Sequence, residues 1–208
     1  MVLFVRHGTT PTTGTVLPGR ARGLHLSDAG REQAEAVAQR LAALAGRPTG
    51  GPVAVYASPL ERTRETAAPI ARALGLRVRT ERGLLECDFG EWTGAELKVL
   101  MRTPAWTTVQ RTPSLFRFPG GESFTDMQQR ITDTVARLVA RHPGETLVAV
   151  SHADPIKAAL AMAAGTHLDL FQRLVVSPCS VSAVSYGPEG THVLTVNSTG
   201  SLADLGLS

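Results

Sequence analysis

The sequence predicts a single α/β domain in which a mainly parallel sheet lies between two layers of helices. Apolar runs of four or five residues, rich in Val, recur along the chain and are too short for buried helices. Amphipathic stretches with helical periodicity separate these runs. The two patterns alternate and end in a pair of strands, which is typical of a three-layer α/β/α arrangement. No linker or internal repeat divides the chain, so we expect one domain over residues 1–208.

Three of the apolar runs have the pattern of strands that are buried on both faces. Each is continuous rather than alternating, as in a parallel sheet covered by helices. The three runs are residues 2–5, 53–57 and 147–150. Near the C-terminus, two further runs flank the turn sequence Gly-Pro-Glu-Gly at 187–190. Residues 181–186 and 192–196 are therefore predicted to form a hairpin.

Four helices are predicted between these strands. Each has apolar residues at helical spacing together with a start or stop signal at one end. They span residues 27–45, 58–74, 122–141 and 154–164. Gly46 can close the first, and the Ser58-Pro59 pair supplies a cap and a first helical residue for the second. Residues 101–121, rich in Thr and Pro, are predicted to form a long loop.

Composition excludes several classes of protein. The chain has 208 residues, 43% of them hydrophobic, which is enough for a sizeable core and too apolar for a disordered chain. No apolar run approaches the roughly 18–20 residues of a membrane helix, and residues 1–5 lack the features of a secretory signal. The net charge is +3, but no basic run is present, so nucleic-acid binding is not expected. Cys87 and Cys179 cannot build a disulfide framework, which fits a reducing cytoplasm.

Cationic and imidazole side chains follow the predicted strands. Arg6 and His7 come directly after the first strand, and His152 follows the third. Arg62 lies in the first turns of the helix after the second strand. The carboxyl ends of parallel strands meet at one edge of a sheet, so we expect these four side chains to lie together. Guanidinium groups beside neutral imidazoles and helix N-termini form a site for a phosphate dianion.

Four blocks of sequence, in this order, resemble those of the histidine phosphatase superfamily, the phosphoglycerate-mutase-like proteins. They are an Arg-His-Gly block at residues 3–10, a Ser-Pro-Leu-x-Arg block at 57–67, an acidic loop at 85–94 and a second-histidine block at 150–152. The Pro-Gly-Gly-Glu-Ser run at 119–123 also recurs in such proteins. The resemblance extends from residue 3 to about residue 156 and implies a phosphoglycerate-mutase-like fold.

The resemblance implies a role in phosphoryl transfer for each of five residues. His7 is the expected nucleophile, and Arg6 and Arg62 are expected to bind the phosphate. His152 would complete this cage, and Glu86 is the expected general acid. The chemistry agrees, because guanidinium groups disfavour the cationic form of a nearby histidine. They also stabilise charge on phosphoryl oxygens without a metal.

Other carboxylates compete for the role of acid. In acid-phosphatase relatives an Asp just after the second histidine donates the proton, and Asp154 lies two residues after His152. Asp154 also precedes Pro155, however, and this is the position of a helix cap, the interpretation we favour. Asp88 and Glu91 belong to the acidic loop and are expected to be solvated.

The sequence departs from the family pattern at several positions. Thr13 stands where an Asn often helps to hold phosphate, so we expect it to bind phosphate through its hydroxyl. Ala153 replaces the Gly that usually follows the second histidine, and His25 stands where Pro is common. We expect His25 to be a surface loop residue, and Cys87 to be a small buried residue rather than a nucleophile.

These features predict a metal-independent phosphatase that hydrolyses small organic phosphomonoesters through a phosphohistidine, without a cofactor. The alternatives are a mutase-type phosphotransferase and a catalytically weak protein that binds phosphorylated ligands. Residues 94–146 have the pattern of one loop and one long helix, with little room for the insertion that shields the intermediate in mutases. We expect a small-molecule partner and neither nucleic acid nor membrane. The sequence does not indicate the oligomeric state.

Aromatic residues in the predicted loop are expected to wall a pocket for the leaving group. They are Trp106, Phe116 and Phe118. Arg111 and Arg117 in the same segment are expected to be solvated, with recognition of a second acidic group of the substrate as the alternative.

Overall fold

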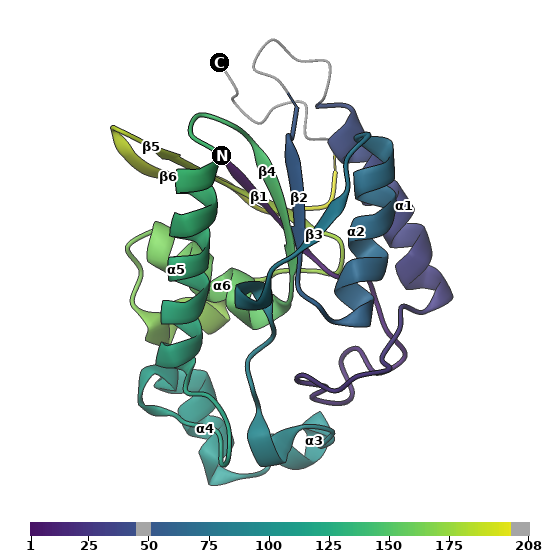
Figure 1. The fold of residues 1–208 in the computed structure, drawn as a ribbon. Coiled ribbons are helices and arrows are strands. Elements are labelled where there is room, and N and C mark those ends of the chain that lie inside the picture. Colours follow the sequence, from purple (N-terminus) through teal and green to yellow (C-terminus); the bar gives the residue numbers. More distant parts are fainter. Residues whose placement is uncertain (45–50, 201–208) are drawn as a thin grey trace.

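The computed structural model describes residues 1–44 and 51–200 of the chain. Within these residues, helices cover both faces of a six-stranded sheet (Figure 1). The strands are β1 (Val2–Arg6), β2 (Ala54–Ala57), β3 (Val78–Thr80), β4 (Leu147–Ser151), β5 (Val181–Gly187) and β6 (Gly190–Ser198). The α-helices are α1 (Asp28–Ala42), α2 (Glu61–Ala73), α3 (Leu97–Leu100), α4 (Pro104–Arg111), α5 (Phe124–Arg141) and α6 (Ala153–Ala163). Short 3-10 helices are η1 (Arg82–Leu84), η2 (Gly90–Trp92), η3 (Pro113–Leu115) and η4 (Leu168–Arg173).

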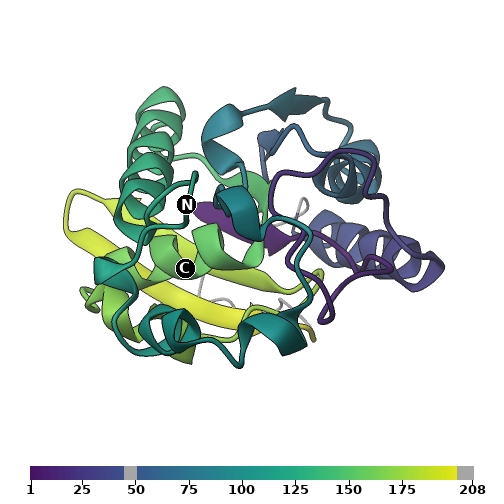
Figure 2. The ribbon, with the colours of Figure 1, turned by 90° about the horizontal axis from the view of Figure 1, so that it is seen from below.

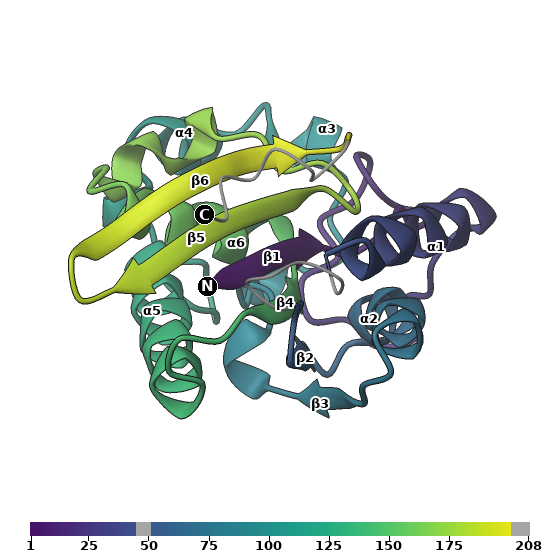
Figure 3. The same cartoon turned by 90° about the horizontal axis from the view of Figure 1, so that it is seen from above.

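The strand order is β3-β2-β4-β1-β5-β6, which Figure 3 shows from above. β1 to β4 are parallel to one another, and β5 and β6 form a hairpin whose strand β5 pairs antiparallel with β1. The mainly parallel sheet and the C-terminal hairpin predicted from the sequence are therefore confirmed. β3 was missed, because three partly exposed residues carry too little apolar pattern to indicate a strand.

Burial on both faces explains why the strands are continuously apolar. Leu3 and Val5 of β1 point toward the layer formed by α1 and α2. Val2 and Phe4 point to the opposite face, which α5 and α6 cover. Figure 1 shows the two helical layers on either side of the sheet. The predicted three-layer α/β/α class is confirmed.

Local capping determines where two of the long helices begin. Ser27 accepts a hydrogen bond from the Gly30 N–H at the start of α1. At the start of α5, Ser123 and Asp126 exchange hydrogen bonds in a capping box. The predicted stop at Gly46 lies outside the described residues. In residues 1–44 and 51–200, no helix has the length and apolarity that crossing a membrane requires.

Two predicted helix starts were wrong. The second helix begins at Glu61, after the extended residue Leu60, and Ser58 does not cap it. At the end of β4 the chain enters α6 directly, so His152 has the N-cap position and Asp154 lies inside the first turn. Asp154 is thus a helical residue and not the cap that its place before a proline suggested.

The predicted long loop at residues 101–121 was also wrong. It contains the eight-residue helix α4, whose N-cap Thr103 accepts a hydrogen bond from the Trp106 N–H, with Pro104 in the first turn. Together with α3, this gives residues 94–146 more regular structure than one loop and one helix.

Candidate active site

Three parallel strands end side by side at one edge of the sheet, which Figure 2 views from below. The ladder extends past the strand ends, because the His7 N–H donates to the Ser151 carbonyl and the Ser58 N–H donates to the Val150 carbonyl. His7, Ser58 and His152 therefore follow β1, β2 and β4 at the same edge, as expected from the carboxyl ends of parallel strands.

The orientation of His7 is fixed by its neighbour in the chain. Its Nδ1 lies 2.8 Å from the Gly8 carbonyl oxygen, which can only accept a hydrogen bond. Nδ1 must therefore carry the proton in the neutral ring, and the lone pair is on Nε2. The side chain is nearly buried, and within the described residues Nε2 has no hydrogen-bond partner.

Gly8 is required by its close approach to the start of α1. A Cβ at this position would lie 2.5 Å from the Gly30 carbonyl oxygen, which is far inside van der Waals contact. The Gly8 N–H donates to the Thr66 hydroxyl of α2 at 3.0 Å. The loop after β1 is thus attached to both helices of one layer, and this attachment positions His7.

Two arginines near His7, the buried Arg62 and the half-buried Arg6, have buried guanidinium nitrogens that make no hydrogen bond within the described residues. Arg62 is 0% exposed, and its Nη2 donates to the Gly19 carbonyl at 2.8 Å. Arg6 donates from Nη1 to the Val176 carbonyl at 2.7 Å. Among the described residues, Nε and Nη1 of Arg62 and Nε of Arg6 are buried without a partner. Unpartnered buried cationic donors cost free energy, and a bound anion would remove that cost.

His152 lies beside His7, with ring centroids 5.2 Å apart in an edge-to-face arrangement. Its Nε2 is 2.9 Å from the Ser58 hydroxyl, and its buried Nδ1 has no partner among the described residues. Ser58 therefore belongs to the candidate site through its contact with His152, and the sequence analysis did not identify it. Its place before a proline suggests a helix cap, and only the distant His152 shows its other use.

Glu86 reaches the site from the loop between η1 and η2. Its Oε2 is 4.0 Å from His152 Nδ1, and its Oε1 accepts from the Cys87 N–H at 2.9 Å. Burial and the charge of Asp154 raise the pKa of the Glu86 carboxyl to about 7, against the opposing charges of Arg62 and Arg6. A carboxyl with this pKa can exchange a proton near neutral pH.

The two histidines are kept neutral. Burial and the positive charges of Arg62 and Arg6 lower the pKa of His7 to about 3, although the bond to the Gly8 carbonyl acts in the opposite direction. Burial and then Arg62 lower the pKa of His152 well below its ordinary value. An unprotonated ring nitrogen is what nucleophilic attack requires.

Asp154 is close enough to act electrostatically on this site. Burial raises the pKa of its carboxyl, and its Oδ1 is 3.9 Å from Lys157 Nζ. Its charge in turn raises the pKa of Glu86. Since it is not a helix cap, Asp154 stays an alternative to Glu86 as the acid.

Thr13 is not brought into hydrogen-bond contact with the other five predicted site residues. Its hydroxyl accepts from the Thr10 N–H at 2.8 Å and lies 3.0 Å from the Thr10 hydroxyl. The side chain thus stabilises a turn in the loop after β1. Phosphate binding by Thr13 stays a prediction.

Several secondary predictions have clear outcomes. His25 is an exposed loop residue, and it bonds to Glu65. Cys87 is fully buried, and burial raises the pKa of its thiol, as expected for a residue that is not a nucleophile. Arg111 and Arg117 are exposed, as expected, and Arg117 also pairs with the exposed Asp126 at the surface.

Of the three aromatic residues predicted to wall a pocket, Phe118 lies in the core, whereas Trp106 and Phe116 are half-buried and pack against the core. Phe118 is 2% exposed and packs against Phe89 and Phe124, with centroids 4.9 and 5.1 Å away. Trp106 stacks on Trp92 at 6.5 Å. A role in the wall of a leaving-group pocket stays a prediction for Trp106 and Phe116.

The described residues contain no group of three or more His, Cys, Asp or Glu side chains arranged to hold a metal ion. The site instead contains a neutral imidazole nitrogen without a partner among the described residues, unpartnered buried nitrogens of two arginines, and a carboxyl with a raised pKa. This set fits phosphate chemistry.

Comparison with known proteins is consistent with the geometry. The family model of the histidine phosphatase superfamily (branch 1) matches residues 2–199. A bifunctional protein of Mycobacterium tuberculosis is 33% identical over 211 residues, which are 97% of this chain and 54% of that protein. The chain thus spans about half the length of this relative. Phosphoserine phosphatase 1 of Hydrogenobacter thermophilus is 29% identical over 206 residues, which are 95% of this chain and 92% of that protein.

Among solved structures, a mycobacterial glucosyl-3-phosphoglycerate phosphatase superposes with a TM-score of 0.83 at 26% identity, covering 95% of this chain and 98% of that one. The similarity in fold therefore includes both helical layers and the sheet between them. Since the family model covers nearly the whole described chain as well, the protein belongs to the histidine phosphatase superfamily.

Proposed function

We propose that the protein is a phosphatase that hydrolyses small organic phosphomonoesters through a phosphohistidine, without a metal or other cofactor. One observation carries the proposal. The free Nε2 of His7 lies in a site whose other walls present the buried, unpartnered nitrogens of Arg6, Arg62 and His152. A phosphate dianion would satisfy those donors and place phosphorus before the nucleophile.

In the first step, His7 Nε2 attacks phosphorus as the bond to the leaving oxygen breaks. Arg6 and Arg62 stabilise the charge on the three phosphoryl oxygens. The Nδ1–H of His7 stays on the Gly8 carbonyl, which stabilises the positive charge that the ring acquires. Glu86 gives its proton to the leaving oxygen, so the organic product departs as an alcohol.

In the second step, water attacks the phosphohistidine. Glu86, now a carboxylate, takes a proton from that water, and the N–P bond breaks to return the electron pair to Nε2. Inorganic phosphate leaves and the site is restored. The raised pKa of Glu86, about 7, suits a group that both gives and takes a proton.

Similar proteins that are named as phosphatases favour hydrolysis over a mutase reaction. A phosphoserine phosphatase and a glucosyl-3-phosphoglycerate phosphatase are similar over nearly the whole chain. The sequence also suggested that residues 94–146 have no room for the insertion that shields the intermediate in mutases. This argument is weaker, because α3 and α4 lie in that segment. The substrate class is thus proposed only as a small organic phosphomonoester.

A cavity of about 320 Å³ provides a place for the organic group. Its lining includes Glu61 and Leu85, the chain neighbours of Arg62 and Glu86. Arg20 and Arg22 also line it. We expect the leaving group to extend in this direction.

The proposal is tested with a panel of phosphomonoesters, together with 3-phosphoglycerate and its bisphosphate primer. We expect release of inorganic phosphate, unchanged by EDTA, and strong inhibition by vanadate, which mimics five-coordinate phosphorus. Formation of the isomeric phosphoglycerate without free phosphate would identify a mutase. Loss of activity in EDTA that returns with a divalent cation would contradict the metal-independent mechanism.

Glu86→Gln should slow turnover most for esters with poor leaving groups. A good leaving group such as 4-nitrophenolate needs little protonation, whereas an alkoxide needs a full proton, and general acids contribute about 10²- to 10⁴-fold. The measurement is kcat/KM for 4-nitrophenyl phosphate and for glycerol phosphate, because this ratio reports the first step and not the later attack of water on the phosphohistidine. Equal losses for both esters would remove Glu86 from the role of acid and leave Asp154 as the candidate.

The same assignment gives a pH dependence. The acid must be protonated, and the pKa of Glu86 is about 7, so kcat for glycerol phosphate should fall as the pH rises above about 7. The pKa of His7 is about 3, so deprotonation of His7 should produce no rise in rate between about pH 4 and 6. In Glu86→Gln the decline above pH 7 should disappear.

A further inference from the structure

The loop that carries Glu86 lies between η1 and η2, outside every helix and strand. Main-chain hydrogen bonds reach Leu85, Asp88 and Phe89, but within the described residues the main chain of Glu86 and Cys87 makes none to other main-chain groups. Position matters here, because misplacement of a catalytic group by about 1 Å can cost about 10²-fold in rate. Side chains from elsewhere must supply the missing attachment.

The position of the Glu86 carboxyl depends on the position of the main chain beside it. Its Oε1 accepts from the N–H of the next residue, Cys87, at 2.9 Å, so the side chain is folded back on the loop. The position of the carboxyl beside His152 is then decided by where the main chain at residues 86 and 87 lies.

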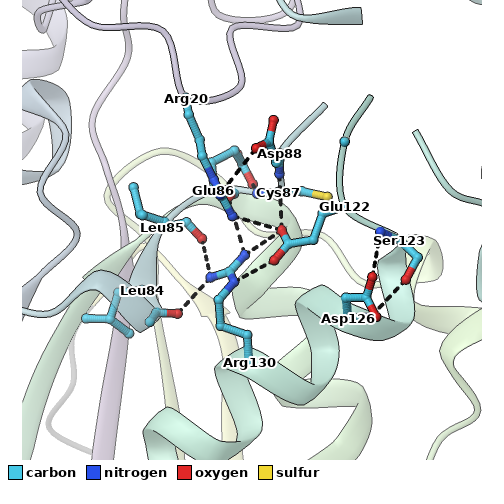
Figure 4. A network of polar contacts seen from close by, with 12 residues as sticks. Arg20, Leu84, Leu85, Glu86, Cys87, Asp88, Glu122, Ser123, Asp126 and Arg130 are labelled. Atoms are coloured by element: carbon cyan, nitrogen blue, oxygen red, sulfur yellow. Dashed lines mark hydrogen bonds and ion pairs between the residues drawn. The ribbon is translucent and has the colours of Figure 1, made fainter. Parts of the chain in front are cut away.

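Arg130 of α5 donates hydrogen bonds to main-chain carbonyls of this segment through its guanidinium group (Figure 4). Nη1 donates to the carbonyls of Gly83 and Leu85, each at 2.8 Å, and Nη2 donates to the Glu86 carbonyl at 3.3 Å. Nε and Nη2 also donate to the two carboxylate oxygens of Glu122 at 2.8 and 2.9 Å. All five N–H groups of an arginine are used in this way.

Glu122 joins Arg130 to the far end of the loop. Its Oε2 accepts from the Asp88 N–H at 3.1 Å, and its own N–H donates to the Asp88 carbonyl at 2.9 Å. Arg20 binds the same two residues: its Nε donates to the Glu86 carbonyl at 2.8 Å, and its Nη2 donates to the Glu122 carboxylate at 2.9 Å. Figure 4 shows Arg20 and Arg130 converging on the Glu122 carboxylate.

We propose that Arg130 and Glu122 are positioning residues that place the Glu86 carboxyl for proton transfer to the leaving group. This inference rests on the phosphatase function proposed above. The two residues act through the main chain of the loop, since none of their hydrogen bonds goes to the Glu86 carboxyl itself. They are therefore distinct from Arg6 and Arg62, which face the phosphate.

The test compares Arg130→Met with Glu86→Gln and with the double variant. Arg130→Met should lower kcat/KM for glycerol phosphate about tenfold more than kcat/KM for 4-nitrophenyl phosphate, because in the first step only glycerol phosphate needs a proton from the acid. The inhibition constant of inorganic phosphate should change by less than about twofold, as the phosphate cage is intact. The double variant should be less than about twofold slower than Glu86→Gln with either ester, because the acid that Arg130 positions is already absent.

The matched control is Arg137→Met, which removes an arginine of the same helix whose partner, Glu81, lies outside this loop. It should leave both rates unchanged. Equal loss for the two esters in Arg130→Met, or full multiplication of the losses in the double variant, would overturn the proposal. If Arg130→Met does not fold, Glu122→Gln replaces it and should change the two rates in the same unequal way.

A readout that needs no turnover separates this inference from the function on which it rests. The Cys87 N–H bonds to the Glu86 carboxyl, so hydrogen exchange at that amide reports the placement of the acid. Exchange should quicken by about tenfold or more in Arg130→Met and stay unchanged in Arg137→Met. Unchanged exchange in Arg130→Met overturns the positioning role, even when the wild type hydrolyses phosphomonoesters. Faster exchange in a protein without phosphatase activity would refute only the proposed function.

Discussion

His7→Ala should abolish turnover of every phosphomonoester while leaving phosphate binding nearly intact. Loss of the nucleophile removes the covalent route, and we expect kcat to fall by at least about 10⁴-fold. Binding survives because Arg6, Arg62 and His152 keep their donors. The measurements are kcat for 4-nitrophenyl phosphate and calorimetric titration with inorganic phosphate.

The variant should fold, since the His7 ring bonds only to the adjacent Gly8 carbonyl and the main-chain bond to Ser151 is kept. The matched control is His25→Ala, which removes an exposed loop histidine and should not change turnover. Retention of more than a tenth of the activity in His7→Ala would exclude His7 as the nucleophile. If the wild type itself binds phosphate but hydrolyses nothing, the binding-protein alternative is favoured.

Arg62→Met should lower kcat/KM by about 10³-fold or more without loss of stability. Each lost donor to a developing oxyanion is worth about 10²- to 10³-fold, and Arg62 has two buried nitrogens free for the phosphate. In the unliganded protein those two nitrogens are buried without a hydrogen-bond partner, which costs free energy, and an apolar side chain of similar length removes that cost. Loss of the hydrogen bond to the Gly19 carbonyl should lower the free energy of unfolding by about 1 kcal/mol and so offset part of this gain.

We therefore expect a melting temperature equal to or above that of the wild type, measured by calorimetry beside steady-state kinetics. Arg64→Met supplies the control, because Arg64 lies on the same helix and is exposed. Its turnover should match the wild type. Activity within tenfold of wild type in Arg62→Met would show that the phosphate binds elsewhere.

The parts of the fold that could be predicted are those that depend on local pattern. Continuous apolar runs at 2–5 and 147–150 indicate strands covered on both faces, and both are buried as expected. The residues after those strands then had to meet at one sheet edge, because parallel strands share their carboxyl ends. Strand order within the sheet does not alter this conclusion.

Helix starts were harder to predict, because a Ser or Thr followed by Pro begins a helix at one place in this chain and not at another. Thr103-Pro104 begins α4, whereas Ser58-Pro59 does not begin α2. The difference is a contact across the fold: the Ser58 hydroxyl lies 2.9 Å from His152 Nε2, far away in sequence. Nothing near Ser58 in the chain signals that contact.

The attachment of the acid loop could not be predicted for the same reason. Arg130 contacts carbonyls 44 to 47 residues earlier, and main-chain acceptors have no sequence signature. Its place on the polar side of an amphipathic helix suggests an ordinary solvated residue. The raised pKa of Glu86 is likewise a product of burial, which only the folded chain supplies.

The most direct test of the account is to trap the covalent intermediate. A phosphomonoester with radioactive phosphorus is mixed with the enzyme, the reaction is stopped by rapid quench into base, and the labelled peptide is mapped. We predict label on His7 that is stable in base and lost in acid, and none in His7→Ala. Label on serine or cysteine in the turning-over wild-type enzyme would contradict the phosphohistidine mechanism.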